Sequence, residues 1–196
     1  DALREVGDRG EAMEVMGDGA AAVVTRLHDE GTLDGVLGLG GSGNTSVATT
    51  AMRALPYGVP KLMVSTMASG DTRPYVGSRD VTMMYSVADI EGLNQLSRRV
   101  LSNAALAMVG MVDADVDVGS DAAATVGVTM FGVTTPCVKA ARAWLEERDY
   151  EAIVFHATGT GGQAMEDLVE QGVIDATLDA TTTELADELV GGVLSA

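Results

Sequence analysis

A chain of 196 residues, 46% of them hydrophobic, can bury one large core or two small ones. Its 29 acidic side chains outnumber the 12 basic ones and give a net charge of -17, spread along the whole chain. An anionic surface suits high salt, which screens its self-repulsion, so we expect a halophilic source. Because proteins bind nucleic acid mainly through lysine and arginine, the charge also argues against a nucleic-acid partner.

Cysteine content and hydropathy bear on the location of the protein. Cys137 is the single cysteine, so no internal disulfide can form. We find no basic-then-apolar leader and no apolar run of about 18 residues, the length that a membrane-spanning helix needs. We therefore expect a cytoplasmic protein with no membrane partner.

The first half of the chain alternates helical patterns with short apolar runs. Residues 11–30 have apolar side chains at helical spacing, and Gly31 follows where a C-cap is expected. Further helices are predicted over residues 44–55 and 91–112. The apolar runs predict buried parallel strands at residues 34–39, 61–67 and 81–87.

Residues 113–123 have no periodicity and are rich in Asp, Gly and Ser, which predicts a domain boundary. The alternation then resumes, with strands expected at residues 125–131 and 152–156 and helices at 136–148, 162–171 and 181–194. This pattern predicts an α/β protein of two Rossmann-like domains with mainly parallel sheets flanked by helices. The first domain is expected at residues 1–118, and residues 123–196 form the first part of the second.

The strongest local signal is a glycine-rich turn between a strand and a helix, GLGGSGNT at residues 38–45. Glycines let the backbone approach a ligand closely, and the free amides of the next helix attract an anion. The turn fits the dinucleotide pattern without the acid that holds a ribose, and it fits the P-loop pattern with Asn44 in place of lysine. We interpret it as a phosphate or carboxylate site, with packing alone as the alternative. The candidate ligand-binding residues are Gly40, Gly41, Ser42, Gly43, Asn44 and Thr45.

A second turn, ATGTGGQ at residues 157–163, also follows a strand and opens a helix. Its candidate binding residues are Thr158, Gly159, Thr160, Gly161 and Gly162, and packing is again the alternative. A ligand between two domains could contact both turns, as is common in open α/β sheets. Thr134 and Thr135, before Pro136, are either further ligand contacts or helix caps.

Other candidate residues have simpler alternatives. In the loop that contains Ser69, Gly70, Asp71 and Arg73, the acid could hold Mg²⁺ or a hydroxyl and the arginine could clamp a phosphate, or the two could form a local pair. Cys137 and His156 could form a nucleophilic pair, or be a small hydrophobe and a strand-end residue. The helical face of Glu184, Asp187 and Glu188 is either a cation site or, as we favour, a solvated surface.

The chain resembles the Tm-1-like ATP-binding family, also known as UPF0261, through GLGGSGNTSVATTAMRALPYGVPKLMVSTMASGDTRPYVGSRD and the residues that follow to 111. The string GVTMFGVTTPCVKAARAWLEERDYEAIVFHATGTGGQ and its continuation, residues 127–196, agree. The resemblance implies that this chain is the central part of a longer protein whose first-domain strands begin before residue 1. The family's plant member inhibits a tobamovirus by binding its replication protein, and its N-terminal region binds ATP. Where many relatives read GGSGG, this chain has Asn44, which we interpret as a substitute that tolerates a left-handed backbone.

Turn chemistry and resemblance together predict that ATP or a similar nucleotide, with or without Mg²⁺, lies between the two turns. One alternative is an enzyme acting on a phosphorylated or carboxylated metabolite through Asp71, Cys137 or His156. Another is an oligomerising interaction module whose glycine turns serve packing alone. We also expect a homo-oligomer.

Overall fold

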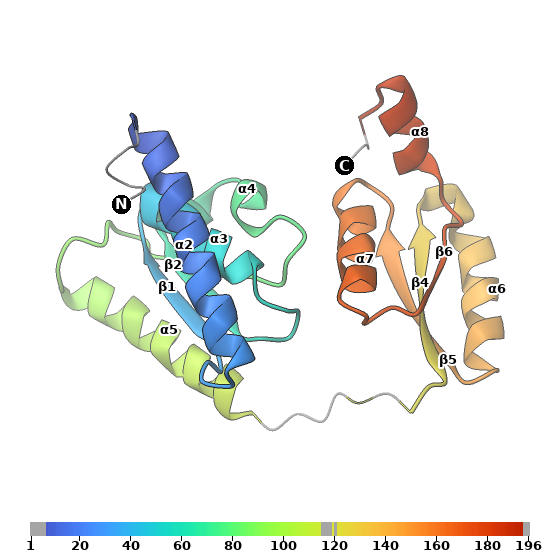
Figure 1. Ribbon diagram of the computed structural model, residues 1–196, viewed down its shortest axis with the longest axis horizontal. Helices are drawn as coiled ribbons and strands as arrows, with labels where there is room; N and C mark the ends of the chain where they lie inside the picture. The colour runs from blue at the N-terminus through green and yellow to red at the C-terminus, as the bar shows by residue number, and fades with distance from the viewer. Residues whose placement is uncertain (1–6, 115–118, 120, 194–196) are drawn as a thin grey trace. The chain divides into compact units, whose positions relative to one another are not determined.

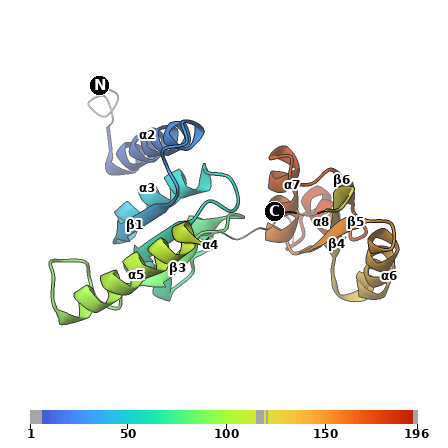
Figure 2. The ribbon, with the colours of Figure 1, turned by 90° about the horizontal axis from the view of Figure 1, so that it is seen from below.

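A computed structural model of the chain describes residues 7–114, 119 and 121–193. The chain divides into two compact units, Asp1–Asp115 and Val116–Ala196. Each contains a three-stranded parallel sheet with helices on both faces (Figure 1, Figure 2). The predicted α/β class with two Rossmann-like parts is confirmed.

The sheet of the first unit has the order β1 (Val36–Gly40), β2 (Lys61–Ser65), β3 (Thr82–Tyr85). Its register pairs Gly40 with Ser65 and Ser65 with Tyr85, so the carboxyl ends of the three strands meet at one edge. α3 (Ser42–Arg53), with α2 (Arg9–Asp29) packed against it, lies on one face, and α5 (Gln95–Asp113) covers the other (Figure 2). This edge is where ligands bind in open parallel sheets.

The central strand β2 is buried along its whole length and fixes both layers. On one face Leu62 and Val64 pack with Ala104 of α5. On the other face the Met63 side chain lies so close to Gly38 that a Cβ there would come within 2.6 Å of its sulfur. Glycine at position 38 therefore leaves room for the Met63 side chain on the sheet face that α3 covers.

Lys61, the first residue of β2, is a charged side chain that is fully buried. Its Nζ donates to the carbonyls of Pro56 (2.8 Å) and Val59 (2.9 Å) and to Asp80 Oδ1 (2.6 Å). All three ammonium hydrogens thus have acceptors, which offsets the cost of burying the charge.

The sheet of the second unit has the order β5 (Tyr150–His156), β4 (Ala124–Met130), β6 (Ala176–Leu178). Val126 and Val128 of β4 pack with Val138 of α6 (Thr135–Glu146), whereas Gly127 faces Met165 of α7 (Thr160–Glu170). α8 (Thr183–Val190) follows β6 and lies on the same side as α7 (Figure 2).

The sequence patterns missed β6, the short helix α4 (Arg73–Val76) and the 3-10 turns Thr66–Ser69 and Gly132–Thr134. β6 has three residues, all exposed, so it presents neither alternation nor an apolar run. Of the expected boundary segment, residues 115–118 and 120 lie outside the described residues. Among the residues described, no helix is both long and apolar enough to cross a membrane.

Candidate functional site

The first glycine turn leaves β1 and enters α3 directly. Gly41 is the N-cap residue, with an extended backbone, and no side chain caps the helix. The Thr45 amide makes the first intrahelical bond, to the Gly41 carbonyl at 2.8 Å. The amides of residues 42–44, at the start of α3, therefore have no side-chain acceptor in the described part of the chain. Such amides, at the positive end of the helix dipole, attract an anion.

A cavity of about 420 Å³ opens in front of this turn, at the carboxyl ends of the three strands. Thr66 and Ser86 supply hydroxyl groups, while the half-exposed side chains of Tyr85 and Val87 supply a ring and an aliphatic surface. Asp89 adds one carboxylate, which also accepts a bond from the Ile90 amide. The remaining lining residues are Gly41, Ser42 and Ala88.

Arg9, at the start of α2, brings a positive charge to the same turn. Its Nη2 lies 3.7 Å from the place that a Cβ on Gly43 would occupy. The side chain is exposed, and we find no ion pair for it within residues 7–114. Arg9 is thus a cation beside Gly43, although it does not line the cavity itself.

Of the predicted set, Thr45 stabilises the turn itself, whereas Asn44 does not have the backbone conformation expected of it. Thr45 is fully buried, and its hydroxyl bonds the Gly41 carbonyl (2.7 Å) and the Ser65 hydroxyl (2.6 Å). Asn44 lies in the first turn of α3 and does not have a positive φ. Our interpretation of Asn44 as a left-handed substitute is therefore wrong: the helix begins earlier than residue 44, and Asn44 adopts helical backbone.

The second glycine turn differs because a carboxylate from the same chain lies on it. Gly159, with φ of 90°, ends the loop after β5, and α7 begins at Thr160. Glu184 Oε1 accepts hydrogen bonds from the amides of Gly159 (2.5 Å) and Gly162 (3.2 Å). Glu184 is half-buried and bonded, so our preferred interpretation of its helical face as solvated is wrong for this residue.

Gly161 is needed for close packing rather than for a ligand. A Cβ at this position would lie 1.9 Å from the His156 carbonyl oxygen. The Thr158 amide donates to that same carbonyl at 2.8 Å, and Thr160 is exposed as the first residue of α7. The turn is thus folded tightly on the end of β5.

The two threonines before Pro136 have unequal surroundings. The Thr134 hydroxyl shares a 2.6 Å bond with the Thr181 hydroxyl and also bonds the Phe131 backbone. Neither threonine forms the expected side-chain cap on α6: Thr134 is its N-cap residue without a capping bond, and Thr135 is its first residue. Thr181 in turn donates its amide to Thr129 Oγ1 at 3.0 Å, so these hydroxyls connect the ends of β4 and β6.

In the loop after β2, Asp71 and Arg73 form a local ion pair, which was the alternative to a ligand-binding role. Arg73 Nη2 donates to Asp71 Oδ2 at 2.8 Å, and both side chains are exposed. This hydrogen bond, helped by one from the Arg73 amide, lowers the pKa of Asp71 to about 2. Ser69 and Gly70 are exposed, and none of these four residues lines the cavity at the first turn.

Cys137 and His156 show no mutual bond in the described residues. Cys137 is an exposed free thiol in the first turn of α6. The His156 ring lies 5.3 Å from the Phe131 ring, centroid to centroid, which is an aromatic contact. A nucleophilic pair therefore gains no support from this arrangement.

An acidic cavity of about 630 Å³ lies between α7, β6 and α8 in the second unit. Its carboxylates come from Glu166, Glu170, Asp179, Glu184 and Glu188. Within the described part of the chain, however, no three Asp, Glu, His or Cys side chains are placed to hold a metal ion. This finding goes against the cation site considered for the face of Glu184, Asp187 and Glu188.

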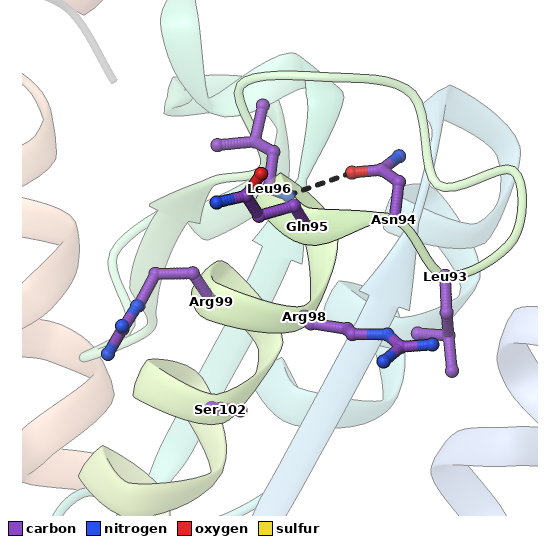
Figure 3. Close-up of a pocket in the computed structure, with 7 residues that line it drawn as sticks. All are labelled: Leu93, Asn94, Gln95, Leu96, Arg98, Arg99 and Ser102. Atoms are coloured by element: carbon purple, nitrogen blue, oxygen red, sulfur yellow. Dashed lines mark hydrogen bonds between the residues drawn. The ribbon is translucent and has the colours of Figure 1, made fainter.

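A larger hollow of about 990 Å³ lies at the start of α5 (Figure 3). Arg98 and Arg99 line it and point to different sides of the helix, beside the exposed side chains of Leu93 and Leu96. Asn94 Oδ1 already accepts from the amides of residues 96 and 97 at this helix start. The hollow thus lacks the free amides of the first glycine turn, which remains the better candidate site.

Comparison with known proteins covers both units. Residues 1–117 match the N-terminal domain, and residues 123–196 the C-terminal domain, of the Uncharacterised protein family (UPF0261). A UPF0261 protein of Clostridium tetani is 58% identical over 189 residues, which cover 96% of this chain and 47% of the relative. The ToMV resistance protein Tm-1(GCR237) of Solanum lycopersicum is 50% identical over 192 residues, 95% of this chain and 26% of that protein. The chain thus spans about half the length of the bacterial relative and a quarter of the plant one.

Proposed function

From the premise that this chain belongs to the UPF0261 family, we propose that its first glycine turn binds the phosphate of a small ligand, with ATP as the leading candidate. The observation that carries the proposal is the uncapped start of α3, facing a cavity at the carboxyl edge of the sheet. Free amides and the dipole of a 12-residue helix favour an anion there. Arg9 adds a cation beside Gly43 and offsets part of the repulsion from the acidic surface.

The other side chains of the cavity favour a nucleotide over inorganic phosphate. Tyr85 presents its ring, 43% exposed, and Val87 presents an apolar surface, as a nucleobase needs for stacking and burial. Asp89 provides an acceptor for a ribose hydroxyl or a ligand for Mg²⁺ brought by the nucleotide. No second glycine turn is required for these contacts, because all of them come from the first unit.

Isothermal titration calorimetry of the full-length protein with ATP tests the proposal. We expect a binding heat with ATP, a weaker one with pyrophosphate and none with adenosine, because the phosphate contacts supply the affinity. Gly41→Val should weaken ATP binding at least about tenfold, since a branched side chain at the N-cap would narrow the approach to the amides. A Cβ at Gly41 has 3.7 Å of space to Thr66 Oγ1, so the variant should fold.

Arg26→Ala is a control for the contribution of Arg9, because Arg26 lies at the other end of the same helix, α2, and pairs with Glu30 there. It should leave ATP binding unchanged. Absence of heat at millimolar ATP, or equal affinity of the wild-type and Gly41→Val proteins, would contradict the proposal.

A further inference from the structure

The carboxylate of Glu184 occupies the place where an external anion would sit on the second glycine turn. Its Oε1 accepts hydrogen bonds from the amides of Gly159 and Gly162 at the start of α7. A Cβ on Gly162 would lie 2.1 Å from Oε2, so the carboxylate rests directly against the bare backbone. Hydrogen bonds from backbone amides to a carboxylate at a helix start are charge-assisted and strong.

Other contacts hold α8 only loosely in the described structure. Leu185, Leu189 and Val190 are 58%, 85% and 82% exposed, so the apolar residues of this helix bury little surface. The segment before it is fastened at Thr181, whose amide and hydroxyl bond Thr129. Glu184 is therefore a direct link between α8 and the start of α7.

We propose that Glu184 is a built-in occupant of the second glycine turn that keeps this turn closed to external anions until α8 moves away. The contact is autoinhibitory: a phosphate or carboxylate ligand reaches the Gly159 and Gly162 amides only by displacing Glu184. Displacement frees α8, so ligand binding at this turn and release of the helix are coupled.

Intramolecular attachment gives Glu184 an advantage over any free anion. A tethered group has an effective concentration in the millimolar range for short flexible links, and an external ligand must exceed it to compete. The neighbouring carboxylates of Glu166, Glu188 and Asp179 line the same cavity and repel an incoming anion. An ordinary metabolite anion would therefore leave the turn closed in the wild-type protein.

The proposal is independent of the function assigned to the first turn. All residues in the contact belong to the second unit, and none lines the cavity beside Gly41. A readout specific to each residue separates the two: amide signals of residues 159–162 report on the second turn, and those of residues 42–44 on the first.

The test is a pyrophosphate titration of the full-length protein, followed through backbone amide NMR signals, together with amide hydrogen exchange of α8. Three variants are compared with the wild type: Glu184→Ala removes the occupant, and Glu184→Gln keeps an oxygen acceptor without the charge. Glu188→Ala is the control, because Glu188 lies on the same helix and lines the same cavity.

We expect the Gly159 and Gly162 signals of Glu184→Ala to respond at pyrophosphate concentrations at least about tenfold lower than in the wild type. Glu184→Gln should respond in between, and the amides of α8 should exchange faster in both variants. Glu188→Ala should match the wild type in exchange and shift its titration by less than Glu184→Ala does.

Two results would overturn the proposal. One is an equal pyrophosphate response of the wild type and Glu184→Ala at residues 159–162. The other is unchanged exchange of α8 in the Glu184 variants. Should Glu184→Ala fail to fold, Glu184→Gln decides alone through the same two readouts, because it retains an acceptor for both amides.

Discussion

Among the described residues, no side chain bonds the amides at the first glycine turn, where α3 begins, whereas the second turn carries the carboxylate of Glu184. Both turns follow a parallel strand and open a helix, and both are rich in glycine. Both turns contain a glycine that packing requires, Gly40 against Asn44 and Gly161 against the His156 carbonyl, but only the first has a glycine at the N-cap with space for a Cβ, Gly41.

This difference shows that a glycine-rich turn after a strand indicates a backbone conformation and does not by itself indicate a binding site. The same free amides can meet an external ligand or a carboxylate from elsewhere in the chain. Which of the two binds the amides depends on residues that are distant in the sequence, such as Glu184. The difference between the two glycine turns can therefore be tested by substitutions in each of them and in the residues that contact them.

The largest effect is expected for Gly161→Ala, which should destabilise the second unit by about 3 kcal/mol or more, because the new Cβ would lie 1.9 Å from a backbone oxygen. Gly41→Ala should cost only about 1 kcal/mol, because glycine is an acceptable N-cap residue and alanine a poor one. Urea unfolding of both variants measures the two costs. Equal costs would remove the distinction between a packed turn and an open one.

A smaller loss is expected for Thr45→Val, which deprives the buried Ser65 hydroxyl of its 2.6 Å partner. The Ser65 oxygen keeps its bond from the Met67 amide (2.9 Å), so the loss of the Thr45 partner should cost about 1 kcal/mol of unfolding free energy, read from the urea midpoint. Ser46→Ala, on the exposed face of α3 one residue away, should change stability by less than about 0.5 kcal/mol. Equal stability of the two variants would show that the Thr45 hydroxyl does not stabilise the turn.

Arg9→Ala should weaken pyrophosphate or ATP binding at the first turn about tenfold, which corresponds to about 1.4 kcal/mol. The second turn should not respond, because Arg9 belongs to the other unit. Calorimetry measures the affinity and amide NMR assigns the loss to residues 42–44. Unchanged affinity would show that the backbone amides act without this cation.

The smallest effect concerns the exposed pair of Asp71 and Arg73, which lines neither turn. Because the pKa of Asp71 is lowered to about 2 from its model-compound value of 3.8, the pair stabilises the fold above that value and loses this effect as the pH falls towards 2. Carboxyl NMR should find Asp71 titrating near pH 2, and Arg73→Gln should move the midpoint up. Stability should hardly change, since both groups are exposed to solvent.

Local patterns in the sequence were sufficient for the fold and for the position of the first turn. Apolar runs such as residues 61–65 identified the strands, and glycine in front of a helical pattern identified both turns. The three-residue strand β6 was missed because its exposed residues have no pattern to recognise.

The contacts that distinguish the two turns could not be predicted, because each joins residues far apart in the sequence. Glu184 lies 25 positions from Gly159, and in a chain this acidic nothing marks one carboxylate among 29. Arg9 reaches Gly43 from a helix that precedes β1. Tertiary packing alone brings these charges to the turns.

Burial of Lys61 has a practical consequence for chemical labelling. The chain has only two lysines, and the other, Lys139, is exposed on α6 of the second unit. An amine acylating reagent should therefore modify Lys139 in the native protein and spare Lys61, whose ammonium is enclosed by three oxygens. Acylation at position 61, detected by peptide mass spectrometry, would then report opening of the first unit without any substitution in the chain.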